Sequence, residues 1–208
     1  MTDIGKKHNT AKNLFFQQLM LLLENEDWGI KLFKMIEVQC KFMPNYHLVL
    51  FPQGEAQIAQ EFENWQDKKM LEILEHEDPQ SKIRAKIARA LEVRLMSVVP
   101  KGVVFKQNAW FLQPCNIFLG GQVYVKTCDL IWRYAGDKSD DFNYYTKRGL
   151  LLGVYISARL FYLCDNSQDF IETKKFIANS LDNIINIASI KNKIKIPSLE
   201  DIPILRMF

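Results

Sequence analysis

Apolar residues recur at spacings of three and four along almost the whole chain, and strict alternation of apolar and polar residues is rare. A helix makes one turn in 3.6 residues, so this spacing places apolar side chains on one helical face. The pattern therefore predicts an all-α fold of about nine helices with short connections. The predicted helices span residues 14–26, 28–41, 44–51, 55–77, 81–98, 104–119, 122–134, 141–164 and 167–190.

Proline and glycine mark most of the predicted breaks. Residues 52–54 (Pro-Gln-Gly) end the third helix, and Pro79 ends the fourth. Residues 100–102 (Pro-Lys-Gly) and the glycine pair 120–121 separate the next three. Proline removes a backbone donor and glycine permits tight turns, so each of these positions is expected to interrupt a helix.

Three short predicted helices precede longer and more apolar ones, a layout that resembles the TetR regulator fold. We therefore predict a helix-turn-helix-like unit at residues 1–53, packed on a helical ligand-binding bundle at residues 54–190. A C-terminal tail at residues 191–208 contains two prolines and an apolar end. The layout makes a TetR-type, lipid-responsive transcription regulator one alternative function.

The third predicted helix argues against DNA binding. Its core, residues 45–51, contains no lysine or arginine, and residues 48–51 are all apolar. A recognition helix needs side chains that reach base edges and phosphates. A net charge of +3 adds no strong electrostatic argument, so we expect no nucleic-acid partner.

The sequence contains no recognisable catalytic or metal-binding motif. None of the three histidines stands three residues after a glutamate, as the di-iron bundles require. The four cysteines lie far apart, which favours scattered buried thiols over a zinc or redox site. We therefore expect a non-enzymatic protein with no metal and no cofactor; an unrecognised enzyme stays open as a rival.

The longest apolar run, residues 150–164, is interrupted by Arg159 and is shorter than the roughly 20 residues of a membrane-spanning helix. In a protein that does not span a membrane, such a helix is expected to lie at the centre of a bundle. Two interpretations stay open: a dry core, or an apolar cavity that holds a lipid tail. The residues assigned to such a cavity are Phe105, Trp110, Phe111, Phe118, Val125, Cys128, Trp132, Leu151, Val154, Ala158 and Phe161.

Residues 129–148 combine aromatic side chains and carboxylates around a Gly-Asp turn at Gly136. Tyr144 and Tyr145 are expected to point about 100° apart on a helix, so at least one should face solvent. An exposed aromatic side chain with charged neighbours is typical of a protein–protein hot spot.

This stretch carries the pattern W-x-x-A-G-D-x-S-x-D-x-N-x-Y-T-K/R-R at residues 132–148. It closely resembles the lipid-binding accessory proteins of ubiquinone biosynthesis, the ninth-numbered Coq family. The resemblance implies a TetR-like fold that binds an isoprenoid quinone or a phospholipid and presents a quinone intermediate to the di-iron demethoxyubiquinone hydroxylase. It also assigns the docking of that enzyme to Asp129, Ile131, Asp141, Tyr144, Tyr145 and Arg148.

The resemblance further implies contact with a membrane surface, and the TetR-like layout implies a possible homodimer. The polar N-terminus shows no signal or transit peptide. We therefore expect a cytoplasmic protein that lies at the periphery of the inner membrane of a bacterium.

Overall fold

The computed structural model describes residues 3–77, 82–137 and 142–191. Within these ranges the chain forms nine α-helices and no strand, which confirms the predicted all-α fold. The helices are α1 (Asp3–Leu23), α2 (Ile30–Gln39), α3 (Tyr46–Leu50), α4 (Glu55–Glu75), α5 (Ile83–Glu92), α6 (Lys101–Phe111), α7 (Ile117–Ala135), α8 (Phe142–Cys164) and α9 (Ile171–Lys191). Much of the predicted tail lies outside the described residues.

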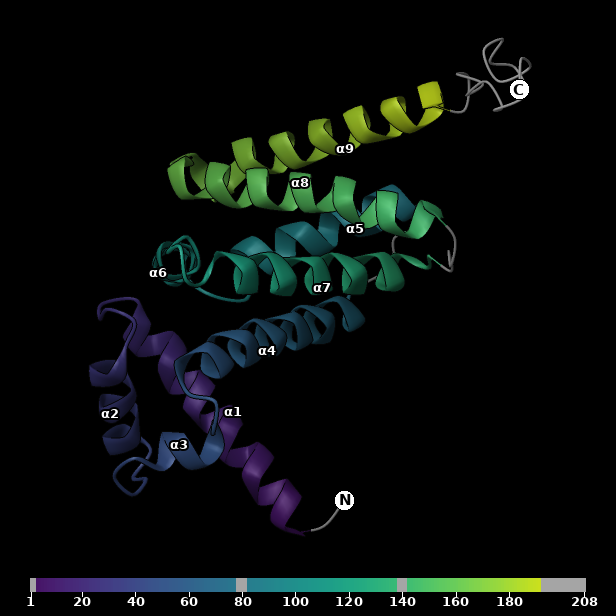
Figure 1. Cartoon of the computed structure of the whole chain (residues 1–208). Helices are drawn as coiled ribbons and strands as arrows, with labels where there is room; N and C mark the ends of the chain where they lie inside the picture. The colour runs from purple at the N-terminus through teal and green to yellow at the C-terminus, as the bar shows by residue number, and fades with distance from the viewer. Residues whose placement is uncertain (1–2, 78–81, 138–141, 192–208) are drawn as a thin grey trace, which may run out of the picture.

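The longer helices stack in layers, with α4, α7, α8 and α9 following one another across the molecule (Figure 1). Helices α7 and α8 run antiparallel as a hairpin, and α5 packs against α7 and α9. Helices α1, α2 and α3 form the opposite end of the molecule (Figure 1). Helix α1 has 21 residues, as many as α4, so the first of the three predicted short helices is not short. The division of the chain at residue 53 and the likeness to the TetR fold stay predictions.

Two apolar clusters hold these parts together. One joins α1, α2 and α3 to α4, α6 and α8, and it includes Phe15, Phe33 and Phe62. The other joins residues of α4 to residues of α5, α6, α7, α8 and α9. The side chain of Trp28 packs against both clusters, and so do two residues that follow α5. Helices α1, α2 and α3 therefore pack directly on the helices that follow them.

The glycine pair at residues 120–121 does not interrupt a helix, so that predicted break is wrong. Helix α6 ends at Phe111, and α7 begins at Ile117, before both glycines. A Cβ atom on Gly120 would lie 3.1 Å from the Cβ atom of Phe111, so the missing side chain lets α7 pass close to α6. The glycine serves packing between two helices, which the local sequence does not reveal.

The predicted helix at residues 81–98 is not one regular helix. Helix α5 ends at Glu92, and the chain continues as a π-helical segment, η1 (Val93–Ser97). Such wider turns are rare and occur frequently at functional sites. Here the turn buries Arg94 completely, together with its two neighbours.

Helix α9 begins later than predicted, after a short 3₁₀ turn, η2 (Gln168–Phe170). The hydroxyl oxygen of Ser167, just before η2, accepts a hydrogen bond from the backbone N–H of Glu172 in the first turn of α9 (3.2 Å). Asp165 also bonds the first turn of α9, because it accepts hydrogen bonds from the backbone N–H (2.9 Å) and the hydroxyl group (2.5 Å) of Thr173. Hydrogen bonds from Ser167 and Thr173 hold the pKa of Asp165 well below its usual range.

The cysteines differ from the expectation of scattered buried thiols. Cys128 is buried in the bundle, whereas Cys115 and Cys164 are exposed and Cys40 is partly exposed. Cys115 lies in the connection after α6 and Cys164 ends α8, positions that tertiary packing leaves open. None of the helices in the described ranges is both long and apolar enough to span a membrane.

Candidate functional site

An apolar pocket of about 230 Å³ lies between α6, α7 and α8. Its mouth carries aliphatic side chains that are half or more exposed, those of Leu112, Ile117 and Leu160. Apolar side chains that face water at the edge of an apolar pocket favour an apolar ligand. The pocket is lined by Asn108, Phe111, Leu112, Ile117, Gly120, Gly121, Tyr124, Ile156, Arg159 and Leu160.

Polar groups gather at one part of the pocket wall. Asn108 Oδ1 accepts a hydrogen bond from Arg159 Nε (2.5 Å) and a second from the Tyr124 hydroxyl group (3.1 Å). These two bonds fix the orientation of the amide, because only its oxygen can accept them. No described residue accepts a hydrogen bond from Asn108 Nδ2, so this NH₂ group is available to an oxygen atom of a ligand.

A buried charge network lies behind these polar groups. Arg159 reaches Glu63 Oε1 (3.3 Å), and Arg94 pairs with Glu63 and with Asp67 Oδ1 (2.8 Å). The hydroxyl group of Thr127 donates a hydrogen bond to Asp67 Oδ2 (2.9 Å). Burial raises the pKa of Asp67, although Arg94 and Thr127 oppose the shift. Two cations thus balance two carboxylates where α4, α7, α8 and η1 meet.

Sequence reasoning missed this network, although the chain contains a signal for it. Glu63 and Asp67 are four residues apart, beside the core residues Phe62 and Met70 of α4. Arg159 interrupts the apolar run of α8. A charged side chain on an apolar helical face is expected to be buried with a partner.

The eleven residues predicted to line a lipid cavity do not converge on this pocket. Phe111 lines it, but five others are packed in the core: Trp110, Cys128, Leu151, Val154 and Ala158. Phe105, Phe118, Val125 and Phe161 are exposed, and Trp132 is half-buried, with its indole N–H bonded to the carbonyl oxygen of residue 147. What the eleven residues share is apolar character, but only those on one face of each helix can line a pocket between helices.

Four of the six predicted docking residues lie together between the end of α7 and the start of α8: Asp129, Tyr144, Tyr145 and Arg148. Gly136 ends α7 in the left-handed conformation (φ 97°), which favours glycine and turns the chain back. Arg148 pairs with Asp129 (2.9 Å) and Asp137 (2.7 Å), and its guanidinium group lies 3.6 Å from the centre of the Tyr144 ring. The Tyr144 hydroxyl group donates a hydrogen bond to Asp129 Oδ1 (3.0 Å).

The pKa of Asp129 reflects this arrangement. Partial burial acts to raise the pKa, but hydrogen bonds from Arg133, Arg148 and Tyr144 outweigh burial and lower it. Asp129 is therefore ionised at neutral pH and holds three side chains in place. We call Asp129, Asp137, Tyr144 and Arg148 the Arg148 cluster.

An aromatic side chain beside the Arg148 cluster, that of Tyr145, faces solvent. Tyr145 is 74% exposed and packs edge-to-face on Tyr144, with the ring centres 5.2 Å apart. This confirms that one of the two tyrosines faces solvent. Ile131 is fully buried and reaches no surface, and Asp141 lies outside the described residues.

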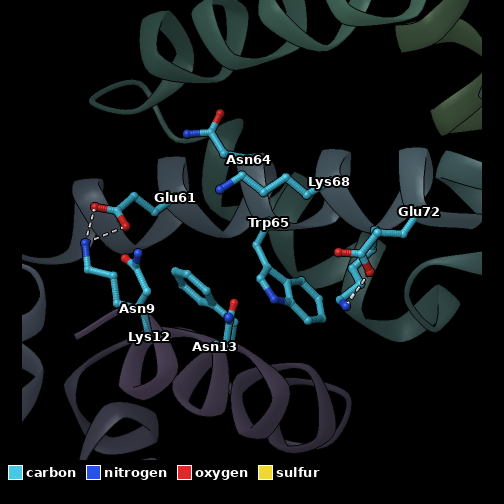
Figure 2. Close-up of a pocket in the computed structure, with 10 residues that line it drawn as sticks. Asn9, Lys12, Asn13, Glu61, Asn64, Trp65, Lys68 and Glu72 are labelled. Carbon is cyan, nitrogen blue, oxygen red and sulfur yellow. Dashed lines mark hydrogen bonds and ion pairs between the residues drawn. The ribbon is translucent and has the colours of Figure 1, made fainter. Parts of the chain in front are cut away.

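A third site is a polar groove of about 420 Å³ between α1 and α4. Figure 2 shows Asn9, Lys12 and Asn13 of α1 facing side chains of α4 across it. Its charges are largely matched, because Lys12 pairs with Glu61 (2.7 Å) and Glu72 pairs with the lysine three residues before it (2.6 Å). Such a groove does not suit an apolar ligand. The described part of the chain contains no group of histidine, cysteine or carboxylate side chains able to hold a metal ion.

A comparison with known proteins shows which family the region around the Arg148 cluster is similar to. The sequence model of the family described as COQ9 matches residues 120–188, which include most of α7, all of α8 and most of α9. The probable ubiquinone biosynthesis protein coq9 of Dictyostelium discoideum is 36% identical over 113 residues, which cover 54% of this chain and 37% of that protein.

Two vertebrate relatives extend the match. Ubiquinone biosynthesis protein COQ9 of Homo sapiens is 32% identical over 107 residues, or 51% of this chain and 34% of that protein. The Xenopus tropicalis protein is 30% identical over 149 residues, or 67% of this chain and 47% of that protein. The chain thus spans about a third to a half of the length of these relatives.

The relatives' names also bear on two earlier expectations. All three proteins are named as mitochondrial, so the predicted bacterial location gains no support from them. Their names give no support to a transcription regulator either. The family model and the relatives agree with each other and with the motif at residues 132–148, and the chain belongs to the COQ9 family.

Proposed function

We propose that this chain acts in ubiquinone biosynthesis as a non-catalytic lipid-binding protein. It holds an isoprenoid quinone intermediate and presents it to the di-iron demethoxyubiquinone hydroxylase, which docks at the Arg148 cluster. The names of the relatives support the pathway. The observation that carries lipid binding is the apolar pocket with the Asn108 amide in its wall.

The size and chemistry of the pocket suit one substituted ring or a short piece of a tail. A protein cavity of about 150 Å³ can bind benzene, so about 230 Å³ accepts a ring of similar size with small substituents. The Asn108 NH₂ group would donate a hydrogen bond to a ring oxygen. Leu112, Ile117 and Leu160 would cover the start of the tail at the mouth.

A long tail is costly to expose to water. Each buried methylene group contributes about 0.8 kcal/mol, so even a partly covered tail gains several kcal/mol over exposure. The pocket is too small for a whole polyprenyl chain. The rest of the tail would lie on the exposed apolar side chains or stay in the membrane.

The pocket and the Arg148 cluster lie toward opposite ends of the α7–α8 hairpin. Gly121 lines the pocket and Gly136 ends the helix, about 22 Å away at 1.5 Å per residue. One helical hairpin would thus carry both the proposed ligand and the proposed partner. This arrangement supports presentation of a bound lipid to a docked enzyme.

Filling the pocket is expected to abolish lipid binding. A Cβ atom on Gly121 would meet no atom within 4 Å, so the side chain of Gly121→Leu extends into open space in the pocket. Purified wild-type protein is expected to contain isoprenoid or phospholipid in lipid extracts analysed by mass spectrometry. The variant is expected to contain at most a tenth of that amount, with no loss of folding.

Gly153→Leu is the matched control. Gly153 lies in α8, outside the pocket, and its Cβ atom would likewise meet nothing within 4 Å. Both variants replace a helical glycine by a better helix former, worth about 1 kcal/mol of stability. Equal lipid content in the two variants, or no lipid in the wild type, would contradict lipid binding at this pocket.

A further inference from the structure

The polar groove between α1 and α4 is lined by several polar side chains that have no partner among the described residues. The carboxamide groups of Asn9, Asn13 and Asn64 make no hydrogen bond with a described residue. The ammonium group of Lys68 has no ion-pair partner among the described residues either. Figure 2 shows these four residues on the two helices that form the groove. A ligand in the groove could therefore bind them without breaking an existing contact.

The charged side chains beside these groups are already held in place. Lys12 Nζ on α1 lies 2.8 and 2.7 Å from the two carboxylate oxygens of Glu61 on α4. Lys69 pairs with Glu72 (2.6 Å), and its ammonium group lies 5.8 Å from the centre of the Trp65 ring. Side chains that are fixed before binding lose little conformational freedom when a ligand arrives.

The two asparagines of α1 have nearly the spacing of an extended polypeptide. Asn9 and Asn13 are four residues apart, so they lie on one helical face about 6 Å apart along the axis. In an extended chain the peptide groups on one edge repeat every two residues, about 6.6 Å apart. Each carboxamide has an oxygen that can accept a hydrogen bond from a backbone N–H and an NH₂ group that can donate to a backbone C=O. Asn64 offers the same groups from the α4 side of the groove.

The length and the charge of the groove fit a short segment with one acidic residue. Its lining on α4 extends from Glu61 to Glu72, about 16 Å at 1.5 Å per residue. About five residues of extended chain cover this length at 3.3 Å per residue. Lys68 is the lining cation that no described carboxylate balances, so one acidic side chain on the segment would match it.

Other classes of ligand fit these groups less well. An anion accepts hydrogen bonds only, so it would leave the carboxamide oxygens unused, and Glu61 and Glu72 would repel the successive phosphates of a nucleic acid. A nucleotide base needs an open aromatic face on which to stack, whereas Phe16 and Trp65 are only 3% and 7% exposed. A polypeptide backbone presents donors and acceptors in alternation, which carboxamides satisfy.

We propose that the groove between α1 and α4 binds an extended segment of another protein through the backbone of that segment, with one acidic side chain of the segment on Lys68. This site goes beyond the proposed function, because neither α1 nor α4 lines the apolar pocket or contributes to the Arg148 cluster. Hydrogen bonds to the main chain provide affinity in this kind of recognition. The extended conformation and the acidic residue therefore define the partner more than an exact sequence does.

The test begins with a library of random linear peptides displayed on phage and selected against the immobilised full chain. Enriched peptides are synthesised, are expected to contain Asp or Glu, and are measured by titration calorimetry. Each hydrogen bond between a carboxamide and the backbone contributes about fivefold in affinity, so Asn9→Ala with Asn13→Ala is expected to weaken binding by about 25-fold. Lys68→Gln is expected to remove most of the dependence of binding on salt.

The matched control is Asn179→Ala with Asn183→Ala. These two asparagines are exposed and have the same spacing on α9, but they lie outside the groove. Both double variants replace helical asparagines by a better helix former, so thermal unfolding is expected to show neither destabilised. The control is expected to bind the peptides like the wild type. Equal affinities of the two double variants, or a selection that enriches no peptide, would overturn the proposal.

Methylation of backbone nitrogens in an enriched peptide tests whether the backbone is recognised. Methyl groups on alternate residues remove the N–H donors of one edge of an extended chain. One of the two alternating sets is expected to abolish binding, because it removes the donors that face Asn9 and Asn13, and the other set is expected to have a smaller effect. A small effect from both sets would show that side chains carry the binding, and the proposal would be wrong.

Two further measurements separate this proposal from others. Sodium tripolyphosphate is expected not to displace the peptide; displacement that depends on Lys68 but on neither asparagine would assign the groove to an anion and overturn the proposal. Gly121→Leu is expected to bind the peptide like the wild type. A failure of lipid retention in the apolar pocket therefore leaves peptide binding intact, and the reverse also holds.

Discussion

Arg94→Met is expected to lower the free energy of unfolding by about 3–5 kcal/mol, because it leaves two buried carboxylates without their shared cation. Arg94 is fully buried in the π-helical segment and pairs with both Glu63 and Asp67. Methionine has a similar length and no charge, so the loss is electrostatic rather than a matter of volume. Urea denaturation at neutral pH measures it.

The loss is expected to depend on pH through Asp67. Burial already raises the pKa of Asp67 above its usual value, so the folded protein binds this proton more tightly than the unfolded chain does. Stability from this group is present below the unfolded pKa and is lost as pH rises through the folded pKa. Arg94 lowers the pKa of Asp67 in the folded protein, so this pKa rises further when Arg94 is replaced. The pH range in which protonated Asp67 stabilises the fold then extends to higher pH. The variant is therefore expected to be closest to wild type at acidic pH.

Two variants serve as controls for Arg94→Met. Arg84→Met removes an exposed arginine that pairs with Asp182 (2.5 Å), and exposed pairs contribute about 0–1 kcal/mol. Adding Asp67→Asn to Arg94→Met removes the carboxylate that no cation balances any longer, since Arg159 still pairs with Glu63, and is expected to restore part of the loss. A cost for Arg94→Met no larger than that for Arg84→Met would contradict the account of the network.

The helices could be predicted because each has an apolar face, and the spacing of apolar residues along the sequence reveals that face. Their ends depend on partners that spacing does not contain. In the sequence Gly120 resembles a helix breaker, but in the structure it lies inside α7 against Phe111. Residues 93–97 have the spacing of a regular helix, but they form a π-helical segment in which Arg94 pairs with Asp67 of α4. Both differences arise from contacts between two helical segments, which the spacing of residues within one segment does not reveal.

The candidate sites were predictable to different degrees for the same reason. The Arg148 cluster comes from one hairpin, so a short motif contains nearly all of it. The pocket needs one face from each of three helices, and apolar character alone selects too many residues. The polar wall of the pocket was the hardest part to predict. In the sequence Arg159 only interrupts an apolar run, and its contacts with Asn108 and Glu63 come from other helices.

Tyr145→Ala is expected to weaken recovery of the di-iron hydroxylase by about 30-fold, the equivalent of the roughly 2 kcal/mol that a hot-spot aromatic contributes. Tyr145 is largely exposed, so the free energy of unfolding is expected to change little. Its ring is supported from behind by Tyr144, which Arg148 and Asp129 hold in place. A supported, exposed ring loses little conformational freedom when a partner covers it.

Phe118→Ala is the matched control for this prediction, since Phe118 is an even more exposed aromatic side chain, near the start of α7 and away from the cluster. Tyr144→Phe separates support from contact: it removes the hydrogen bond to Asp129 but keeps the ring beneath Tyr145. Pull-down with titrated hydroxylase is expected to show a small loss for Tyr144→Phe and none for Phe118→Ala. If Phe118→Ala lost the partner and Tyr145→Ala kept it, docking would lie at the pocket end of the hairpin. The Arg148 cluster would then serve only to join α7 to α8.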